Sequence, residues 1–113
     1  MRNPRRGEVW LVDLGLAAKV RPALVMSIPP GDEDRALVTV VPHTTSVRGS
    51  RFEAAVSVNF LKAGAFDAQG VLTMPLAKLL GSLGTLKPNE LAEVEMCLRD
   101  WLDLPISPTE VGP

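Results

Sequence analysis

The sequence predicts a mainly β domain that ends in a single α-helix. Five short segments rich in β-branched and aromatic residues are separated by Gly, Pro and Asp turn residues, and one later segment has helical periodicity. At 113 residues the chain is long enough for one small hydrophobic core. Short strands joined by short turns favour a closed or nearly closed β-barrel or a β-sandwich.

The predicted strands are the segments in which β-formers end at a turn signal. In the fourth of them, alternation predicts that Ala54, Val56 and Val58 face the core, whereas Glu53 and Ser57 face outward. Between the strands, residues 59–69 are expected to be irregular and residues 76–84 to contain a short helical turn. We expect strands over residues 8–15, 21–28, 36–43, 52–58 and 70–76.

The helix is predicted to begin at Pro88, a residue that is favoured at the first helical position. Glu95 and Arg99 have the spacing of an ion pair on the exposed face of this helix. Residues 105–113 form a Pro-rich tail that is expected to fray. One helical stripe is predicted to pack on the sheet, and it consists of Leu91, Val94, Leu98 and Trp101.

Composition narrows the functional classes. No apolar run approaches the roughly 18 residues of a membrane-spanning helix, and the N-terminal segment lacks the pattern of a signal peptide, so a cytoplasmic location without membrane association is expected. The single cysteine, Cys97, excludes an internal disulfide and a Cys-based zinc cluster, and it is expected to be a small hydrophobic residue of the core. Trp10 is also expected to lie in the core. The single histidine cannot form a metal cluster, and no nucleotide-binding glycine motif is present, so no cofactor is predicted.

Charge is distributed unevenly along the chain. Residues 1–62 contain nine Lys or Arg against six Asp or Glu, whereas residues 63–113 contain three against seven. A basic half and an acidic half are compatible with one face that meets an anion, although solvated surface charge accounts for the pattern equally well.

Arg21 stands directly before Pro22 at the start of an apolar run. The proline ring disfavours helical backbone at Arg21, and proline is tolerated at the first position of a strand. Arg21 is therefore expected at a strand entrance, on the rim of the core. One interpretation is a rim arginine paired with a carboxylate, and the other is a guanidinium that binds a ligand.

The segment 42–51, PHTTSVRGSR, collects three hydroxyls, a histidine and two arginines at the end of a predicted strand. If the strand continues, His43 and Thr44 point to opposite faces, and only one of them lines a given cleft. A histidine in this position is more often structural than catalytic. A simple polar loop is the alternative interpretation of the whole segment.

Three motifs occur in one order: RGEVWLVDLG, VRPALVMS and VVPHTTSVRG. Together they resemble the MazF/PemK family of toxin–antitoxin toxins, and the similarity covers about residues 6–104. The resemblance implies a single domain over residues 1–113 with an SH3-like small β-barrel, the CcdB/PemK-like fold, that works as a homodimer. It also implies a metal-independent endoribonuclease that cleaves single-stranded RNA at short sequences and is inhibited by a cognate antitoxin.

The resemblance implies a site as well. The family's catalytic arginine and threonine correspond to Arg21 and Thr44 in this sequence. Because the RNA 2′-hydroxyl can attack the adjacent phosphate, the protein needs to orient the strand and stabilise charge, which suits the guanidinium of Arg21. The general base is left unassigned. Thr45, Ser46 and His43 are neighbouring candidates, and the cations expected to bind flanking phosphates are Lys19, Arg48, Arg51 and Lys78.

The sequence departs from the family pattern in two places. The first loop, residues 15–20, is short, and residues 75–78 read PLAK where the family often has an acid-Gln-x-Arg motif, so that Lys78 replaces an arginine. An inactive homologue is therefore one alternative. A gyrase-poisoning toxin of the CcdB type, which relies on a Trp near the C-terminus, is another, although Trp101 is more simply explained as part of the core.

Overall fold

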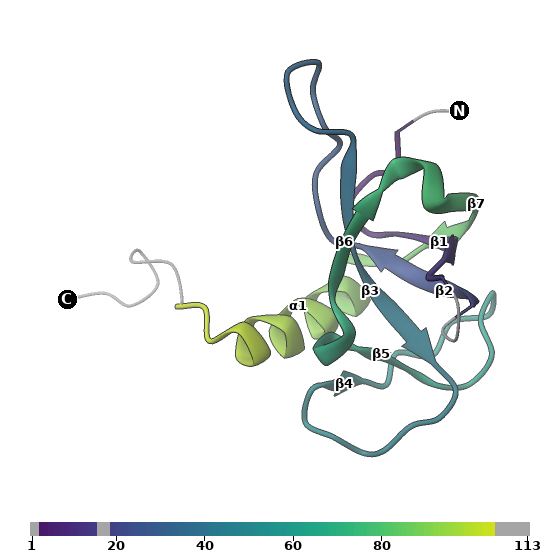
Figure 1. Ribbon diagram of the computed structural model, residues 1–113. Helices are drawn as coiled ribbons and strands as arrows, with labels where there is room; N and C mark the ends of the chain where they lie inside the picture. The colour runs from purple at the N-terminus through teal and green to yellow at the C-terminus, as the bar shows by residue number, and fades with distance from the viewer. Residues whose placement is uncertain (1–2, 16–18, 106–113) are drawn as a thin grey trace.

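A computed structural model describes residues 3–15 and 19–105, which form an antiparallel β-sheet with one α-helix beside it (Figure 1). Two short 3-10 helices, η2 (Ala68–Gly70) and η3 (Leu76–Lys78), interrupt the chain between strands. The α-helix is α1 (Pro88–Leu102). The strands are β1 (Glu8–Asp13), β2 (Val20–Val25), β3 (Leu37–Thr44), β4 (Glu53–Ala54), β5 (Ala65–Asp67), β6 (Leu72–Pro75) and β7 (Leu79–Thr85).

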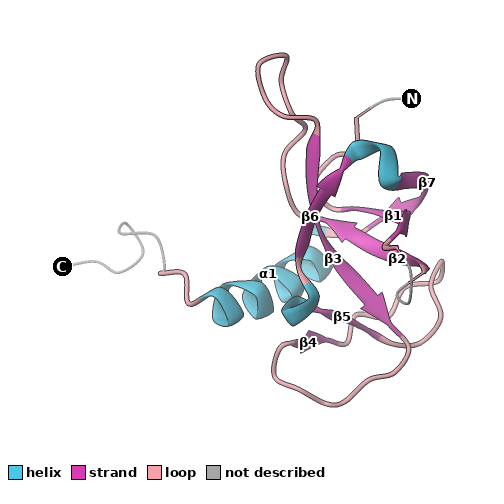
Figure 2. Ribbon diagram, in the orientation of Figure 1, coloured by secondary structure: helices cyan, strands magenta, loops and turns pink. Residues whose placement is uncertain are grey.

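The sheet has the order β4-β5-β3-β2-β1-β7, and β6 also pairs with β3 (Figure 2). β2 lies along one edge of β3, whereas β5 and β6 follow one another along the opposite edge. Among the described strands no ladder joins β7 to β4, so hydrogen bonds do not close the sheet into a barrel. The prediction of a mainly β domain with a C-terminal helix is confirmed.

Both faces of the central strands are buried, in two separate hydrophobic clusters. Along β1 and β2, Val9 and Leu24 belong to the cluster that includes Val94 of α1, whereas Trp10 and Val25 belong to the other cluster, with Met74 of β6 and Leu79 of β7. Successive residues of a strand point to opposite faces, so one apolar run supplies both clusters. Trp10 is buried, as the sequence predicts.

Two predictions for this part of the chain are wrong: the strand expected over 52–58 is reduced to the two residues of β4, and residues 59–69, expected to be irregular, include the strand β5. The short helical turn expected within 76–84 is confirmed as η3, and the residues after it form β7. Short strands such as β5 and the Gly-containing β7 are stabilised by their partners β3 and β1 rather than by local propensity. The inward positions Ala54 and Val56 are nevertheless buried.

The helix α1 begins at Pro88 as predicted, and the side chain of Glu90 accepts a hydrogen bond from the backbone N–H of Lys87 at 2.7 Å. Val94 is fully buried, and Leu91 and Leu98 pack beside it. Trp101 does not belong to the core, because it is 42% exposed and contacts Phe52 edge-on at 5.2 Å.

Glu95 pairs with Arg6, and Arg6 also donates to the carbonyl of Met26; these contacts replace the predicted pair with Arg99. Tertiary contact thus displaces a pairing that helical spacing alone allowed.

Cys97 is half-buried against the cluster that contains Val94, and burial raises the pKa of its thiol. Within residues 3–15 and 19–105, the structure contains no helix long and apolar enough to cross a membrane.

Candidate active site

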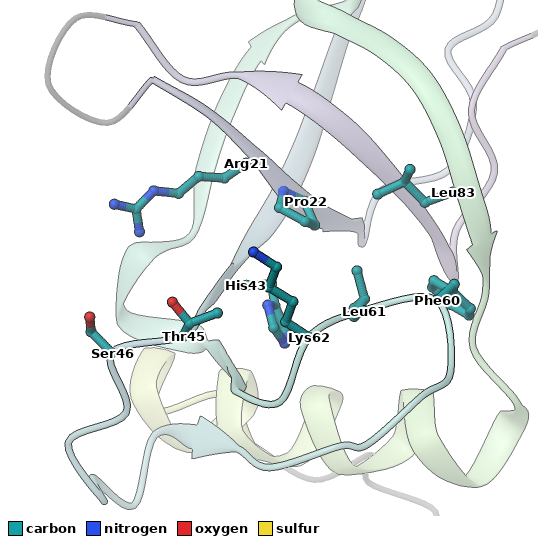
Figure 3. A pocket seen from close by; sticks show the side chains of 9 residues that line it. All are labelled: Arg21, Pro22, His43, Thr45, Ser46, Phe60, Leu61, Lys62 and Leu83. Atoms are coloured by element: carbon teal, nitrogen blue, oxygen red, sulfur yellow. The ribbon is translucent and has the colours of Figure 1, made fainter.

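A pocket of about 360 Å³ opens where β2 begins and β3 ends (Figure 3). It brings together residues from β2, from the end of β3, from the segment before β5, and from β7. The lining residues are Arg21, Pro22, His43, Thr45, Ser46, Phe60, Leu61, Lys62 and Leu83.

Arg21 reaches this pocket from the second residue of β2. Its backbone pairs with Val12 of β1, so the residue is extended as the following proline requires, and its side chain is exposed. Pro22 is half-buried and pairs with Leu11. The prediction that Arg21 lies at a strand entrance on the rim of the core is confirmed.

The pocket has a polar end and an apolar end. Figure 3 shows the Arg21 guanidinium on the same side as the hydroxyl groups of Thr45 and Ser46, whereas Phe60 and Leu83 lie at the opposite side. The Phe60 ring lies directly against the backbone of β7, since a Cβ placed on Gly84 would be 2.6 Å from Phe60 Cε1. Glycine at position 84 therefore makes room for the ring that forms this end.

His43 forms part of the wall between the two ends. The residue is only 4% exposed, and its ring meets Phe66 of β5 edge-on at 5.1 Å. Its Nε2 atom is the one buried side-chain nitrogen or oxygen without a hydrogen-bond partner in the described part of the chain. Burial lowers the pKa of His43, so its neutral form is favoured. An unpartnered buried polar atom generally costs about 1–3 kcal/mol.

Thr44 lies outside this pocket and lines a second one of about 300 Å³. Its Oγ1 accepts a hydrogen bond from the backbone N–H of Ser46 at 3.0 Å, which fixes the turn after β3. Ser46 lines both pockets, so the two adjoin. The second pocket is lined by Thr44, Ser46, Arg48, Ser50, Glu53, Asp67 and Gln69.

The carboxylate of Glu53 organises the loop beside the second pocket. It accepts hydrogen bonds from the backbone N–H groups of Arg48, at 3.1 and 3.2 Å, and of Ser50, at 2.9 Å. These backbone hydrogen bonds, that of Arg48 first, lower the pKa of Glu53. Asp67 accepts a similar bond from the N–H of Gln69 at 3.1 Å.

The structure therefore divides the predicted site residues. Arg21, His43, Thr45 and Ser46 share the first pocket, whereas Thr44 lines the second. His43 and Thr44 are adjacent in β3, and alternation sends one side chain toward each pocket.

The other predicted RNA-binding cations are dispersed. Arg48 lines the second pocket, and the guanidinium of Arg51 lies 4.5 Å above the ring of Phe52. Lys78 faces Asp13 at 4.0 Å between Nζ and Oδ2. Lys19 is exposed at the start of β2 with a φ of 55°. None of these four lines the first pocket.

Lys62 is a lining residue that the sequence did not single out. It was one of the basic residues of the first half of the chain, but it lies within the segment expected to be irregular, so nothing local connected it with Arg21. The pairing of β5 with the end of β3 draws the preceding segment, and Lys62 with it, to the pocket. Within the described residues, no three His, Cys, Asp or Glu side chains are grouped as a metal ion would require.

Comparison with known proteins gives one family and several solved structures. Residues 5–102 match the family described as PemK-like, MazF-like toxin of type II toxin–antitoxin system. An endoribonuclease in complex with its cognate antitoxin from a Mycobacterial species superposes with a TM-score of 0.78 at 27% identity, covering 92% of this chain and 99% of that one.

Two further solved structures are similar. The toxin MazF-mt6 of Mycobacterium tuberculosis has a TM-score of 0.75 at 26% identity and covers 88% of this chain and 99% of its own. A MazE–MazF structure from Deinococcus radiodurans has a TM-score of 0.78 at 22% identity, with 93% and 100% coverage, and supports the fold.

Proposed function

Because the chain belongs to the family of PemK-like, MazF-like toxins of type II toxin–antitoxin systems, we propose that it is an endoribonuclease toxin that cleaves single-stranded RNA. One observation carries this proposal beyond family membership: Arg21 and Lys62 line one pocket with the hydroxyls of Thr45 and Ser46, and none of its described lining residues is acidic. Two cations and two hydroxyl donors suit a phosphodiester.

The reaction requires little covalent chemistry from the protein. The ribose 2′-hydroxyl of RNA attacks the adjacent phosphorus, so no protein nucleophile and no metal ion is needed. Arg21 stabilises the charge that develops on the phosphoryl oxygens, and Lys62, which lines the same pocket, adds a second positive charge. DNA lacks the 2′-hydroxyl and would bind without being cut.

The shape of the pocket suits an unpaired strand. With the phosphate beside Arg21, a neighbouring base would extend toward Phe60 and Leu83 at the apolar end. Bases that are stacked and paired in a duplex cannot enter such a recess, whereas a single strand can turn a base into it.

Thr44 and the dispersed cations have supporting roles. The hydrogen bond from the N–H of Ser46 to Thr44 makes Thr44 a positioning residue for the turn that presents Thr45 and Ser46. Arg48 extends positive charge into the second pocket, where the strand would continue, and Lys19, Arg51 and Lys78 lie outside the first pocket and would contact the strand at more distant phosphates.

The family also indicates the assembly. We propose a homodimer, since β7 exposes Leu80 and Leu83 and has β1 as its one ladder partner among the described strands. We further propose a partly open SH3-like barrel, cytoplasmic action on mRNA, and inhibition by a cognate antitoxin whose acidic segment covers the cations of the pocket.

The described residues of the two departures from the family pattern do not line the pocket. Leu14 donates to the carbonyl of Lys19 and Lys19 to that of Gly15, which closes the short first loop, although residues 16–18 lie outside the described part of the chain. Lys78 pairs with Asp13 and does not line the pocket. The solved structures above 25% identity carry the names of an endoribonuclease and a MazF toxin, which favours the nuclease over an inactive or gyrase-poisoning homologue.

The test is cleavage of a long single-stranded RNA by the purified protein in EDTA, with Arg21→Ala beside it. We expect defined fragments from the wild type and far fewer from the variant in the same time, while circular dichroism shows the same folded structure. Intact RNA with a folded wild-type protein would contradict the proposed function. Equal cleavage by Arg21→Ala would remove Arg21 from the site.

A further inference from the structure

His43 has three properties that structural packing alone does not explain. Its side chain is almost completely buried, its Nε2 has no hydrogen-bond partner, and it lines the pocket that contains Arg21. A phenylalanine would pack edge-on against Phe66 equally well without burying an unpartnered nitrogen. An imidazole at this place is explained by a partner that arrives with the substrate.

We propose that His43 is the general base of the RNA cleavage reaction and accepts the proton of the ribose 2′-hydroxyl at Nε2. This inference rests on the proposed function. His43 is the only histidine of the chain, and imidazole is the side chain whose ordinary pKa suits proton transfer near neutral pH.

The surroundings of the ring keep it in the form that a base requires. The charged groups that line the same pocket are Arg21 of β2 and Lys62 of the segment before β5, and both are cations. Phe66 of β5 contributes only an apolar ring, and burial lowers the pKa of His43. Desolvation favours the neutral imidazole, which can accept a proton.

Lys62 is an exposed residue of the same pocket. In Figure 3 the Lys62 side chain passes in front of the His43 ring, and both residues line the pocket. On another side the backbone of Gly64 lies close to the ring, because a Cβ on Gly64 would be 2.8 Å from His43 Cε1 and 2.2 Å from the carbonyl oxygen of Thr44. A phosphate beside Arg21 would attract the Lys62 ammonium group, and a shift of that side chain would expose Nε2 to the ribose.

The step balances without a co-reactant. The 2′-oxygen forms a bond to phosphorus while its proton passes to Nε2 of His43, and the bond from phosphorus to the 5′-oxygen of the next nucleotide breaks. That 5′-oxygen takes a proton from solvent, and the imidazolium later releases its proton to solvent. The products are a 2′,3′-cyclic phosphate and a 5′-hydroxyl end.

The experiment compares His43→Phe and His43→Gln with the wild type in single-turnover cleavage. Phe keeps a packed ring, and Gln keeps a hydrogen-bond acceptor that cannot take up a proton. We expect both variants to cut RNA about 10²- to 10⁴-fold more slowly than the wild type. Their affinity for a strand of the same sequence with 2′-deoxy sugars, which cannot be cleaved, should be unchanged. The matched control is Val94→Ala, which loosens the same hydrophobic cluster from α1, outside the pocket, and should retain activity within a few-fold.

Two further readouts separate proton transfer from a structural role. The wild-type rate should rise with pH along a limb governed by one group with a pKa below the ordinary 6.5, and this limb should disappear in His43→Gln. Because there is one histidine, its NMR signal needs no assignment, and the 2′-deoxy RNA should shift that signal.

Each outcome decides a separate question. If His43→Phe and His43→Gln cleaved RNA at the wild-type rate and with the same pH limb, His43 would not be the general base, and the proposed nuclease function would still hold. An equally large loss in Val94→Ala would assign the effect to packing. If the wild type did not cleave, the proposed function would fail, and an unshifted histidine signal on RNA binding would independently show that His43 does not face RNA.

Discussion

The two adjoining pockets differ in charge although they share Ser46. The first contains Arg21 and Lys62 with no acidic residue among its described lining, whereas the second contains Arg48 together with Glu53 and Asp67. The carboxylates of the second pocket accept backbone hydrogen bonds that hold the loop after β3 in place. The comparison indicates that the first pocket is suited to an anion and that the second supports the turn beside it.

Among the variants that compare the two pockets, the largest effect is expected at Arg21, because it brings a fixed positive charge to the first pocket. Arg21→Ala should lower single-turnover cleavage by about 10²- to 10³-fold, as removal of one preorganised charge donor does elsewhere. The side chain is exposed, so the melting temperature should not change. The matched variant is Arg48→Ala in the second pocket, for which we expect a loss below about 10-fold. Equal losses would contradict the distinction between the pockets.

The adjacent threonines provide the sharpest test of pocket membership. Thr45→Val removes a hydroxyl from the first pocket and should slow cleavage by about 10-fold, the equivalent of 1.4 kcal/mol. Thr44→Val removes the acceptor for the Ser46 N–H and should lower stability by about 0.5–1.5 kcal/mol with a smaller effect on the rate. Urea unfolding and cleavage rates together distinguish the two. A larger kinetic loss in Thr44→Val would mean that Thr44 contacts the RNA itself.

A smaller effect, on binding, is expected at Lys62. Lys62→Ala should weaken binding of single-stranded RNA several-fold and reduce the slope of log K against log salt by about 0.7, the value for one phosphate contact. Arg35→Ala is the control, because Arg35 is an exposed cation that does not line the first pocket. Fluorescence anisotropy at several salt concentrations measures the binding constant K. If Lys62 did not contact a phosphate, the slope of log K against log salt would be unchanged in both variants.

The smallest effect is expected on the unfolding free energy of the protein and its pH dependence, through Glu53 of the second pocket. The pKa of Glu53 is lowered by the backbone N–H groups of Arg48 and Ser50, so its carboxylate stabilises the fold above the unfolded-state pKa, and this contribution is lost as pH falls through the lower folded-state value. Wild type should therefore exceed Glu53→Gln in unfolding free energy at neutral pH, with the difference narrowing in acid. Urea titrations from neutral pH to about pH 3 measure it. A difference independent of pH would assign the effect to shape instead.

Much of the site follows from local sequence rules. The proline at position 22 restricts the backbone of Arg21, which places it at a strand entrance, and strand alternation separates His43 from Thr44. The helix from Pro88 was likewise predictable from its first residue and its apolar spacing. Each of these depends on neighbours within a few residues, which is why the sequence alone indicated them.

Tertiary structure decided which residues meet. Alternation could not tell whether His43 or Thr44 faces Arg21, because that depends on how β3 pairs with β2 on one edge and β5 on the other. The same pairing draws Lys62 to the pocket, and the packing of α1 beside the sheet joins Glu95 to Arg6. Such contacts link residues distant in the chain, and their free energy arises only when the strands and the helix pack together. Local sequence rules predicted the mainly β class, the C-terminal helix and the rim arginine, whereas strand register and packing determined β5, β7 and the composition of each pocket.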